Sequence, residues 1–294
     1  MNRTAATAFL ALLIGCGNPE GPSSDNSAST GAESTQGSTG EITSTVAGSV
    51  GGTTDPSGST SGSVTAASDD ASSGGADSSS SGSTGEPPPE VPAGVFLWTG
   101  SGGGGPGTDL YPDAVLATLT DAGVDAELGD ALPADFEARF GTLVYLNPTE
   151  DFDPPVNAAA TNLVEAGGRV VLVMEHCKNG CWGNAEGHND LLSSLGSSLR
   201  MVGDGGAPLS DTALVLTPTP PLTDGVSDLI VYYSGHVEVG VCGAALGAMD
   251  GGDVIIGVES LGWGEVVAVA DSSVLGYRLA SGDNERFVQN WALH

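Results

Sequence analysis

The chain has 294 residues, with 37 acidic against 7 basic side chains and a formal net charge of −30 at pH 7. Residues 93–294 alone carry 27 acidic and 6 basic side chains. Such an excess of negative charge repels nucleic acid and anionic lipid headgroups, so we expect neither as a partner. The charge suits solubility and cationic ligands instead.

Residues 1–15 have the pattern of an export signal. Arg3 gives a positively charged start, and the apolar run 5–14 is too short to span a bilayer as a stable helix. The run ends in Leu13-Ile14-Gly15-Cys16, which resembles the lipobox of bacterial lipoproteins. The resemblance implies cleavage before Cys16, acylation of that residue and a lipid anchor in the cell envelope. Gly17 rather than aspartate follows, which favours the outer membrane. An ordinary secretory signal is the alternative.

Residues 16–92 consist mainly of Ser, Thr, Gly and Ala, with acidic residues and proline but no Lys or Arg. The segment has no aromatic residue and no sustained apolar periodicity. It therefore cannot bury enough apolar surface to offset the entropy lost on ordering. We predict a disordered tether with a root-mean-square span of about 50 Å, which acts as a spacer.

Residues 93–294 are numerous enough for one domain with its own core. Short apolar runs alternate with helical patterns in the order β-α-β-β-α-β. This order favours a mostly parallel sheet wrapped by helices. The predicted strands are 94–98, 124–128, 143–146 and 170–174, and the predicted helices are 111–122 and 156–166.

The pattern changes after residue 174. We predict a helix at 189–195, additional strands within 213–241, and a closing helix at 284–293. Two apolar segments, 253–259 and 265–270, flank the short turn 260–264 and predict a hairpin.

The end of the sequence resembles a known family. Residues 264–273 read Gly-Glu-Val-Val-Ala-Val-Ala-Asp-Ser-Ser, and residues 282–291 read Gly-Asp-Asn-Glu-Arg-Phe-Val-Gln-Asn-Trp. Both are similar to the end of class I glutamine-amidotransferase-like domains, especially their non-catalytic bacterial branch. Residues 189–196 and 221–226 fit the same branch. The resemblance covers most of 94–294 and implies a flavodoxin-like three-layer sandwich.

The sequence departs from the catalytic members of that family at two places. Their nucleophilic cysteine stands in a Gly-x-Cys-x-Gly turn after a central strand, where this chain reads Glu175-His176-Cys177-Lys178-Asn179. Their later His-x-Glu corresponds to Ala270-Asp271-Ser272 here. Amidotransferase activity is therefore not expected.

The loop after the strand at 170–174 holds the candidates for chemistry, because ligands of open α/β sheets bind beyond the carboxyl ends of the strands. Cys177 could act as a nucleophile, with His176 or His188 as its base and Glu175 orienting that base. Neighbours in sequence rarely face each other, so the adjacency of His176 and Cys177 is weak support.

The three cysteines outside the signal favour a disulfide instead. In an oxidising envelope, Cys177, Cys181 and Cys242 should give one disulfide and one buried or free thiol. We expect a Cys177–Cys181 disulfide, for which Cys242 is a competing partner. A zinc site formed by Cys177, Cys181, His176 and His188 is a further alternative, but the spacing of these residues is not a standard zinc pattern. The sequence does not identify a metal.

Polar side chains next to the last predicted strand and helix are expected at the same edge of the sheet. Asp271 and Ser272 follow the strand, and Asp283 and Asn284 open the helix. Asp283 or Asn284 suits a helix N-cap. Hydrogen bonds that fix loops are the favoured role, and a ligand or calcium site is the alternative.

Aromatic residues and a glycine run are the remaining candidates at this edge. Trp98, Trp182 and Trp263 fall in or beside the predicted edge loops, where they could stack on sugar rings; core packing is expected for at least two of them. Residues 100–105 satisfy Gly-x-Gly-x-x-Gly with Glu127 further on, a dinucleotide-binding layout. A run this rich in glycine satisfies the pattern by chance, so we expect no bound cofactor.

The sequence thus predicts a membrane-anchored lipoprotein that presents a non-catalytic ligand-binding or interaction domain. Its partner would be an envelope ligand or protein that the sequence does not identify. The alternative is a hydrolase or amidotransferase-like enzyme that uses Cys177.

Overall fold

The computed structural model describes residues 90–100, 110–148, 152–177 and 182–294 of the chain. The signal segment, Cys16 and nearly all of the tether lie outside the described residues. Cys181 and most of the glycine run 100–105 lie outside them as well. What the sequence predicts for these residues stays a prediction.

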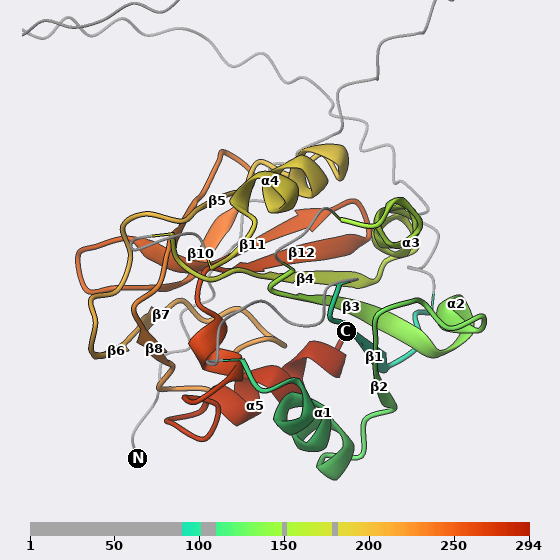
Figure 1. Cartoon of the computed structure of the whole chain (residues 1–294), viewed down its shortest axis with the longest axis horizontal. Coiled ribbons are helices and arrows are strands. Elements are labelled where there is room, and N and C mark those ends of the chain that lie inside the picture. The colour runs from blue at the N-terminus through green and yellow to red at the C-terminus, as the bar shows by residue number, and fades with distance from the viewer. Residues whose placement is uncertain (1–89, 101–109, 149–151, 178–181) are drawn as a thin grey trace, which may run out of the picture. The chain divides into compact units, whose positions relative to one another are not determined.

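An eight-stranded sheet forms the centre of the fold (Figure 1). The first five strands across it run parallel to one another, and the last three pair antiparallel. The predicted α/β class with a mostly parallel sheet is therefore confirmed. In spatial order the strands are β2 (Ala126–Gly129), β1 (Gly94–Trp98), β3 (Phe140–Leu146), β4 (Arg169–Val173), β12 (Gly264–Val269), β11 (Val254–Leu261), β10 (Ala244–Ala248) and β7 (Val215–Leu216).

The five parallel strands follow the order 2-1-3-4-5 of flavodoxin-like sheets, with β12 in the fifth place. Strand β12 comes late in the chain because residues 174–263 form an excursion between β4 and β12. In sheets of this order, the order reverses between β1 and β3, and ligands bind at the carboxyl ends of the strands near that point. The topology therefore directs attention to the residues that follow β1, β3, β4 and β12.

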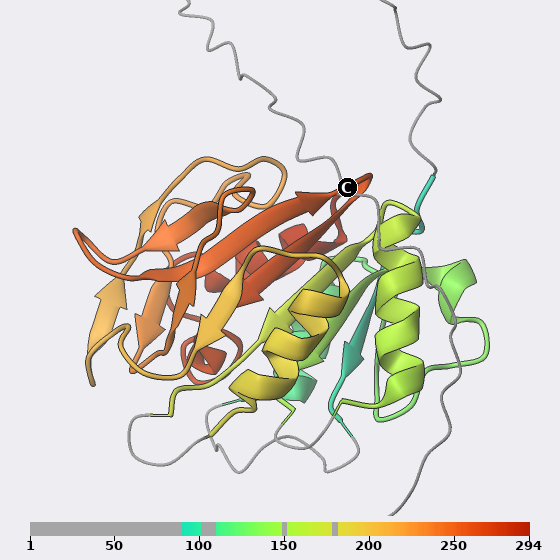
Figure 2. The same ribbon diagram turned by 90° about the horizontal axis from the view of Figure 1, so that it is seen from above.

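Helices cover both faces of the sheet, which makes three layers (Figures 1 and 2). One face carries α3 (Pro154–Glu165) and α4 (Ala185–Ser194), and the other carries α1 (Pro112–Asp121) and α5 (Asn284–Gln289). Both α1 and α3 begin with proline, whose fixed φ suits the first helical position. Gly167, with φ of +95°, ends α3 in the left-handed conformation that glycine adopts at no steric cost.

Side chains of the central strands alternate between the two layers of the core. In β1, Val95 and Leu97 pack with α1 and α5, whereas Phe96 and Trp98 pack with α3 and α4. Every residue of β1, β3 and β4 is buried. Burial on both faces explains why these strands read as continuous apolar runs rather than as alternating ones.

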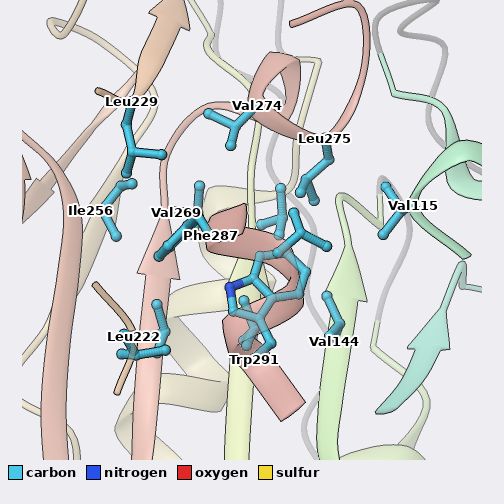
Figure 3. Packing of buried hydrophobic residues seen from close by; sticks show 14 of the residues in the cluster. Val115, Val144, Leu222, Leu229, Ile256, Val269, Val274, Leu275, Phe287 and Trp291 are labelled. Carbon is cyan, nitrogen blue, oxygen red and sulfur yellow. The ribbon is translucent and has the colours of Figure 1, made fainter. Parts of the chain in front are cut away.

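Trp291 lies at the centre of the core layer on the α1 and α5 face (Figure 3). It belongs to the short helix η2 (Asn290–Ala292) and is fully buried. Its ring meets Phe287 edge-on, with 5.8 Å between ring centroids. Val144 of β3 and Val269 of β12 line the same layer. The carboxyl end of the chain is thus a component of the core.

The remaining elements are short. No helix in the described ranges combines the length and the apolar character of a membrane span. Two small antiparallel sheets lie within the excursion between β4 and β12. These elements are α2 (Phe136–Arg139), β5 (Arg200–Val202) with β9 (His236–Glu238), β6 (Asp211–Ala213) with β8 (Ile230–Tyr232), and η1 (Ser272–Leu275).

Candidate functional site

A buried polar cluster lies at the carboxyl ends of the central strands, where the topology favours a ligand site. Glu175 follows β4 and is 4% exposed, and Ser272 follows β12 and is 1% exposed. The Ser272 hydroxyl donates a short hydrogen bond to Glu175 Oε2, and His176 N donates to Glu175 Oε1 at 2.9 Å. The structure thus brings Glu175 and Ser272 together, as expected of residues at one sheet edge. Their burial and mutual bonding keep both from a substrate.

Asn147, directly after β3, holds this cluster in place, and the sequence did not single it out. Its Oδ1 accepts a hydrogen bond from Glu175 N at 3.1 Å, and its Nδ2 donates to Trp182 O at 2.9 Å. Its φ is +44°, a conformation in which asparagine is favoured among residues other than glycine. The signal for it was the pair Asn147-Pro148 after a buried strand, which marks a turn at the expected edge.

His176 packs in the same cluster and meets Tyr233. The two rings contact each other edge-on, with 4.1 Å between centroids, and His176 is 9% exposed. His176 Nε2 lies 3.8 Å from Glu175 Oε1, beyond hydrogen-bonding distance. Tyr233 has φ of +56°, an uncommon conformation for an aromatic residue, and it lies between β8 and β9. Its place beside His176 could not be read from the sequence.

Cys177 is not a free thiol. Cys177 and Cys242 are both disulfide-bonded, and the described part of the chain holds no free cysteine. The expectation of one buried or free thiol beside one disulfide therefore fails at Cys242. A sulfur in a disulfide is not a nucleophile of the kind that a cysteine hydrolase needs.

The two cysteines lie at opposite ends of β5. Cys177 N donates to Gly203 O at 2.7 Å just after the strand, and Cys242 N donates to Ser198 Oγ at 3.4 Å just before it. An extended stretch from residue 198 to residue 203 spans about 16 Å, whereas the Cα atoms of a disulfide lie within about 7 Å. This separation argues against a Cys177–Cys242 bond. The predicted pairing of Cys177 with Cys181 stays a prediction, because Cys181 is outside the described residues.

His188 cannot serve as a base or as a zinc ligand. It is fully buried in α4, with Nδ1 2.6 Å from Asn184 O and Nε2 3.0 Å from Val173 O. Its ring packs edge-on against Phe152 at 4.9 Å between centroids. Burial lowers the pKa of His188 to about 4, although the two carbonyl oxygens favour the charged form. Both nitrogens are thus engaged by the backbone, which corrects the assignment of His188 as a catalytic candidate.

Asp271 fixes a loop, as the favoured interpretation predicted. Its Oδ1 accepts a hydrogen bond from Ser273 N at 2.8 Å and caps η1, and its Oδ2 accepts one from Tyr232 N at 2.7 Å. Asp271 has no solvent-exposed surface. It therefore joins the end of β12 to β8.

Asp283 binds the segment before β8, and Asn284 binds Ile230, the first residue of β8. Asp283 Oδ2 accepts hydrogen bonds from Ser227 N at 2.8 Å and Asp228 N at 3.1 Å, and these bonds hold the pKa of its carboxyl below the usual range. Asp283 occupies the N-cap position of α5 without a side-chain capping bond. The predicted N-cap position of Asp283 is thus confirmed, but its side chain does not make the predicted capping hydrogen bond.

Replacing Asn284 with alanine is expected to lower the free energy of unfolding by about 2 kcal/mol. Asn284 Oδ1 accepts from Ile230 N at 3.0 Å, and Nδ2 donates to Ile230 O at 2.8 Å and Arg278 O at 2.9 Å. Alanine would remove the partner of Ile230 N and Ile230 O in a fully buried place, whereas Arg278 O would still accept from Ser281 N. Urea unfolding monitored by circular dichroism measures the change. The neighbouring exposed Glu285→Ala variant, expected within about 0.5 kcal/mol of wild type, is the control, and an equal effect of the two would refute this role.

The tryptophans divide as core and surface. Trp98 is 1% exposed, donates from Nε1 to Asp130 O at 2.9 Å and packs on Tyr145 at 5.0 Å between centroids. This burial corrects its assignment as a ligand-edge candidate. Trp182, at 36% exposed, and Trp263, at 58%, keep accessible rings. Trp182 alone of these two is near the cluster, through its carbonyl bond with Asn147.

Two further site hypotheses concern a metal ion and a dinucleotide, and each includes residues outside the described ranges. Among the described residues, no group of three or more His, Cys, Asp and Glu side chains could hold a metal ion. Glu127, which a dinucleotide fingerprint would place on a ribose, instead accepts a hydrogen bond from Arg139 Nη1 at 2.7 Å. Most of the glycine run itself is outside the described residues.

Comparison with known proteins identifies a fold and no family. No family model and no curated protein matches the sequence. The structure is similar to the mmIFT52 N-terminal domain, with a TM-score of 0.50 and 10% identity over 68% of this chain and 96% of that one. It is also similar to the cytoplasmic protein STM1381 from Salmonella typhimurium LT2, with a TM-score of 0.47 and 13% identity over 62% of this chain and 85% of that one.

A GMP synthase-like protein from Thermoplasma acidophilum has a TM-score of 0.43 and 9% identity over 67% of this chain and 91% of that one. Identities this low indicate a shared fold alone. The pairing of the strands itself shows an α/β fold with a mostly parallel sheet, and the function of the chain must be argued from its own residues.

Proposed function

We propose that this chain is a cell-envelope lipoprotein whose α/β domain binds a ligand or partner without catalysing a reaction. The observation that carries the proposal is the state of Cys177. Where catalytic amidotransferases carry a nucleophile after the central strand, this chain has a disulfide-bonded cysteine. The neighbouring acid and histidine do not supply a substitute, because Glu175 is bonded to Ser272 and His188 to backbone carbonyl oxygens.

The membrane anchor is the second part of the proposal. It is supported by the lipobox-like Leu13-Ile14-Gly15-Cys16 and by the tether composition of residues 16–92. Lipid anchoring through several acyl chains would be firm, since each buried methylene contributes about 0.8 kcal/mol. Acylation requires that the Cys16 thiol is not in a disulfide, so with Cys177 bonded to Cys181 the partner of the disulfide-bonded Cys242 would be a cysteine of another chain. The state of all four cysteines therefore tests both parts together.

The experiment is peptide mapping of the full chain, purified from membranes without reductant after alkylation with N-ethylmaleimide. We expect a linked Cys177–Cys181 peptide and an N-terminal peptide whose mass includes acyl groups on Cys16. A sample reduced before alkylation is the control, and it should show both loop cysteines labelled.

Two results would count against the proposal in different ways. A Cys177 that is labelled within minutes at neutral pH would make the chain a candidate cysteine hydrolase. A Cys16 linked to Cys242 would exclude acylation of its thiol and hence the lipoprotein anchor.

A further inference from the structure

A groove of about 610 Å³ lies at the amino ends of β4 and β12, opposite the edge that carries the buried cluster. The carboxyl ends of α3 and α4 and the turn between β11 and β12 form its walls. Figure 2 shows the two helices on the same face of the sheet. Its principal lining residues are Glu165, Ser194, Glu259, Ser260, Leu261 and Trp263.

The electrostatic potential of this groove favours a cation. Two helices end at it, and the carboxyl end of a helix carries a partial negative charge of about half an elementary charge. Basic residues commonly offset this charge, but the last turns of α3 and α4 contain none. Two carboxylates, those of Glu165 and Glu259, line the same space, and the described lining residues include no Lys, Arg or His.

Glu259 presents one carboxylate oxygen that the protein does not use. The side chain is in β11 and only 3% of the residue is exposed. Its Oε2 accepts hydrogen bonds from Ser198 N at 2.7 Å and from the hydroxyls of Ser197 at 2.8 Å and Ser198 at 3.1 Å. Its Oε1 has no hydrogen-bond partner among the described residues. The carboxylate is thus fixed in position through one oxygen, and Glu259 is among the residues that line the groove.

Trp263 supplies a flat apolar surface at the rim. It follows Gly262, whose φ of +63° makes the tight turn between β11 and β12, and it is 58% exposed. An indole face attracts cations, and a planar guanidinium both stacks on it and donates hydrogen bonds at its edge. A fixed carboxylate can accept hydrogen bonds from the edge of a guanidinium, and an indole in the same groove can stack on its face.

We propose that this groove binds an arginine side chain presented by a basic segment of a partner protein. The guanidinium would donate to Glu259 Oε1 and stack on Trp263, while Glu165 and the helix ends stabilise its charge. A neutral sugar would also stack on the indole, but it would leave both carboxylates and both helix ends uncompensated. This inference rests on the proposed binding function and gives it a place and a partner chemistry.

The test is titration calorimetry of the full chain with the peptide acetyl-Gly-Gly-Arg-Gly-Gly-amide at low ionic strength. The same peptide with citrulline in place of arginine has the same shape without the charge. We expect the arginine peptide to bind and the citrulline peptide to bind at least tenfold more weakly. Trp263→Ala should weaken binding of the arginine peptide about fivefold, and Glu259→Gln about tenfold.

Matched variants on the other helical layer are the controls. Tyr111→Ala removes an aromatic ring of 46% exposure, and Glu285→Gln removes an exposed carboxylate of α5. Both should bind the arginine peptide as wild type does. A thermal melt of Glu259→Gln, which keeps an acceptor for Ser198 N, identifies loss of fold.

Equal binding of the arginine and citrulline peptides, an unchanged affinity of Trp263→Ala, or binding of a neutral oligosaccharide alone would overturn the inference. Those outcomes would leave the cysteine mapping to decide the proposed function.

Discussion

Replacing Arg169 with methionine is expected to lower the free energy of unfolding by about 3–5 kcal/mol. Arg169 opens β4 and is 1% exposed, and its guanidinium forms an ion pair with Glu265 at the start of β12. Its Nη1 also donates to Trp291 O and to Asn290 O, the latter at 3.2 Å. The substitution would leave the Glu265 carboxylate without its cation in a mostly buried place and would remove one of two donors from each carbonyl, which is the costly way to break such a pair.

Urea unfolding of the variant measures this change. The urea concentration at the midpoint should fall, while the dependence of the free energy of unfolding on urea concentration should stay the same. Arg200→Met is the matched control, because Arg200 is largely exposed and its contact with Glu238 is 4.0 Å, so the expected change is below about 1 kcal/mol. The double variant Arg169→Met with Glu265→Met should lose less than the sum of the two single changes, since no charge is left unpaired. A single Arg169→Met variant within about 1 kcal/mol of wild type would show that the pair is not an anchor.

The free energy of unfolding should fall by about 3 kcal/mol between pH 7 and pH 4 through His188 alone. Burial lowers the pKa of His188 from 6.5 to about 4 in the folded protein. Between these two values the unfolded chain binds a proton that the folded chain does not. Stability from His188 is therefore full above pH 6.5, decreases as the pH falls from 6.5 to the folded pKa, and levels off below it. Burial also lowers the pKa of His294 to about 4, assisted by the charge of Arg169, which adds a loss in the same direction.

The measurement is a series of urea unfolding curves from pH 4 to pH 8 for wild type and His188→Gln. The carboxylates contribute equally to both proteins, so the difference between the two curves isolates His188. We expect that difference to shrink as the pH falls from 6.5 to 4. The matched control is His236→Gln, which removes the imidazole of a β9 residue outside the core. It measures any general effect of replacing a histidine with glutamine. A pH dependence of His188→Gln that is identical to wild type would contradict the assignment.

The long, buried elements could be predicted from the sequence, and the short ones could not. Strand β1 was predicted with its observed bounds and β4 within one residue, because strands buried on both faces read as uninterrupted apolar runs. The hairpin of β11 and β12 was predicted from two apolar segments on either side of a short turn. Strands β5 and β10 and helix α2 were missed, because three to five residues carry little periodicity and their pairing depends on distant segments.

The candidate site was found in part, and its errors have identifiable causes. Asp271 and Ser272 were expected at the edge that carries Glu175, and the order of the strands puts them there. Asn284 was expected with them, but its amide binds Ile230 in a segment that no local pattern places. The exposure of Trp98 was predicted wrongly. The sequence does not show whether the last residue of a strand points into a core layer, and the Trp98 side chain packs in the same layer as Tyr145. Helix α4 begins four residues earlier than predicted, because Asn184 accepts a capping bond from Gly187 N.

The late position of β12 has a kinetic consequence. Strand β4 ends at Val173, and its parallel neighbour β12 begins only at Gly264, so the middle of the sheet closes across about 90 residues. Contacts so distant in sequence slow folding, because the loop must close before the contacts form. Trp291 of η2, which follows β12 in the chain, belongs to the same core. The native core therefore cannot form before β12 and η2 have been synthesised, a delay that suits a polypeptide that we propose is exported before it folds.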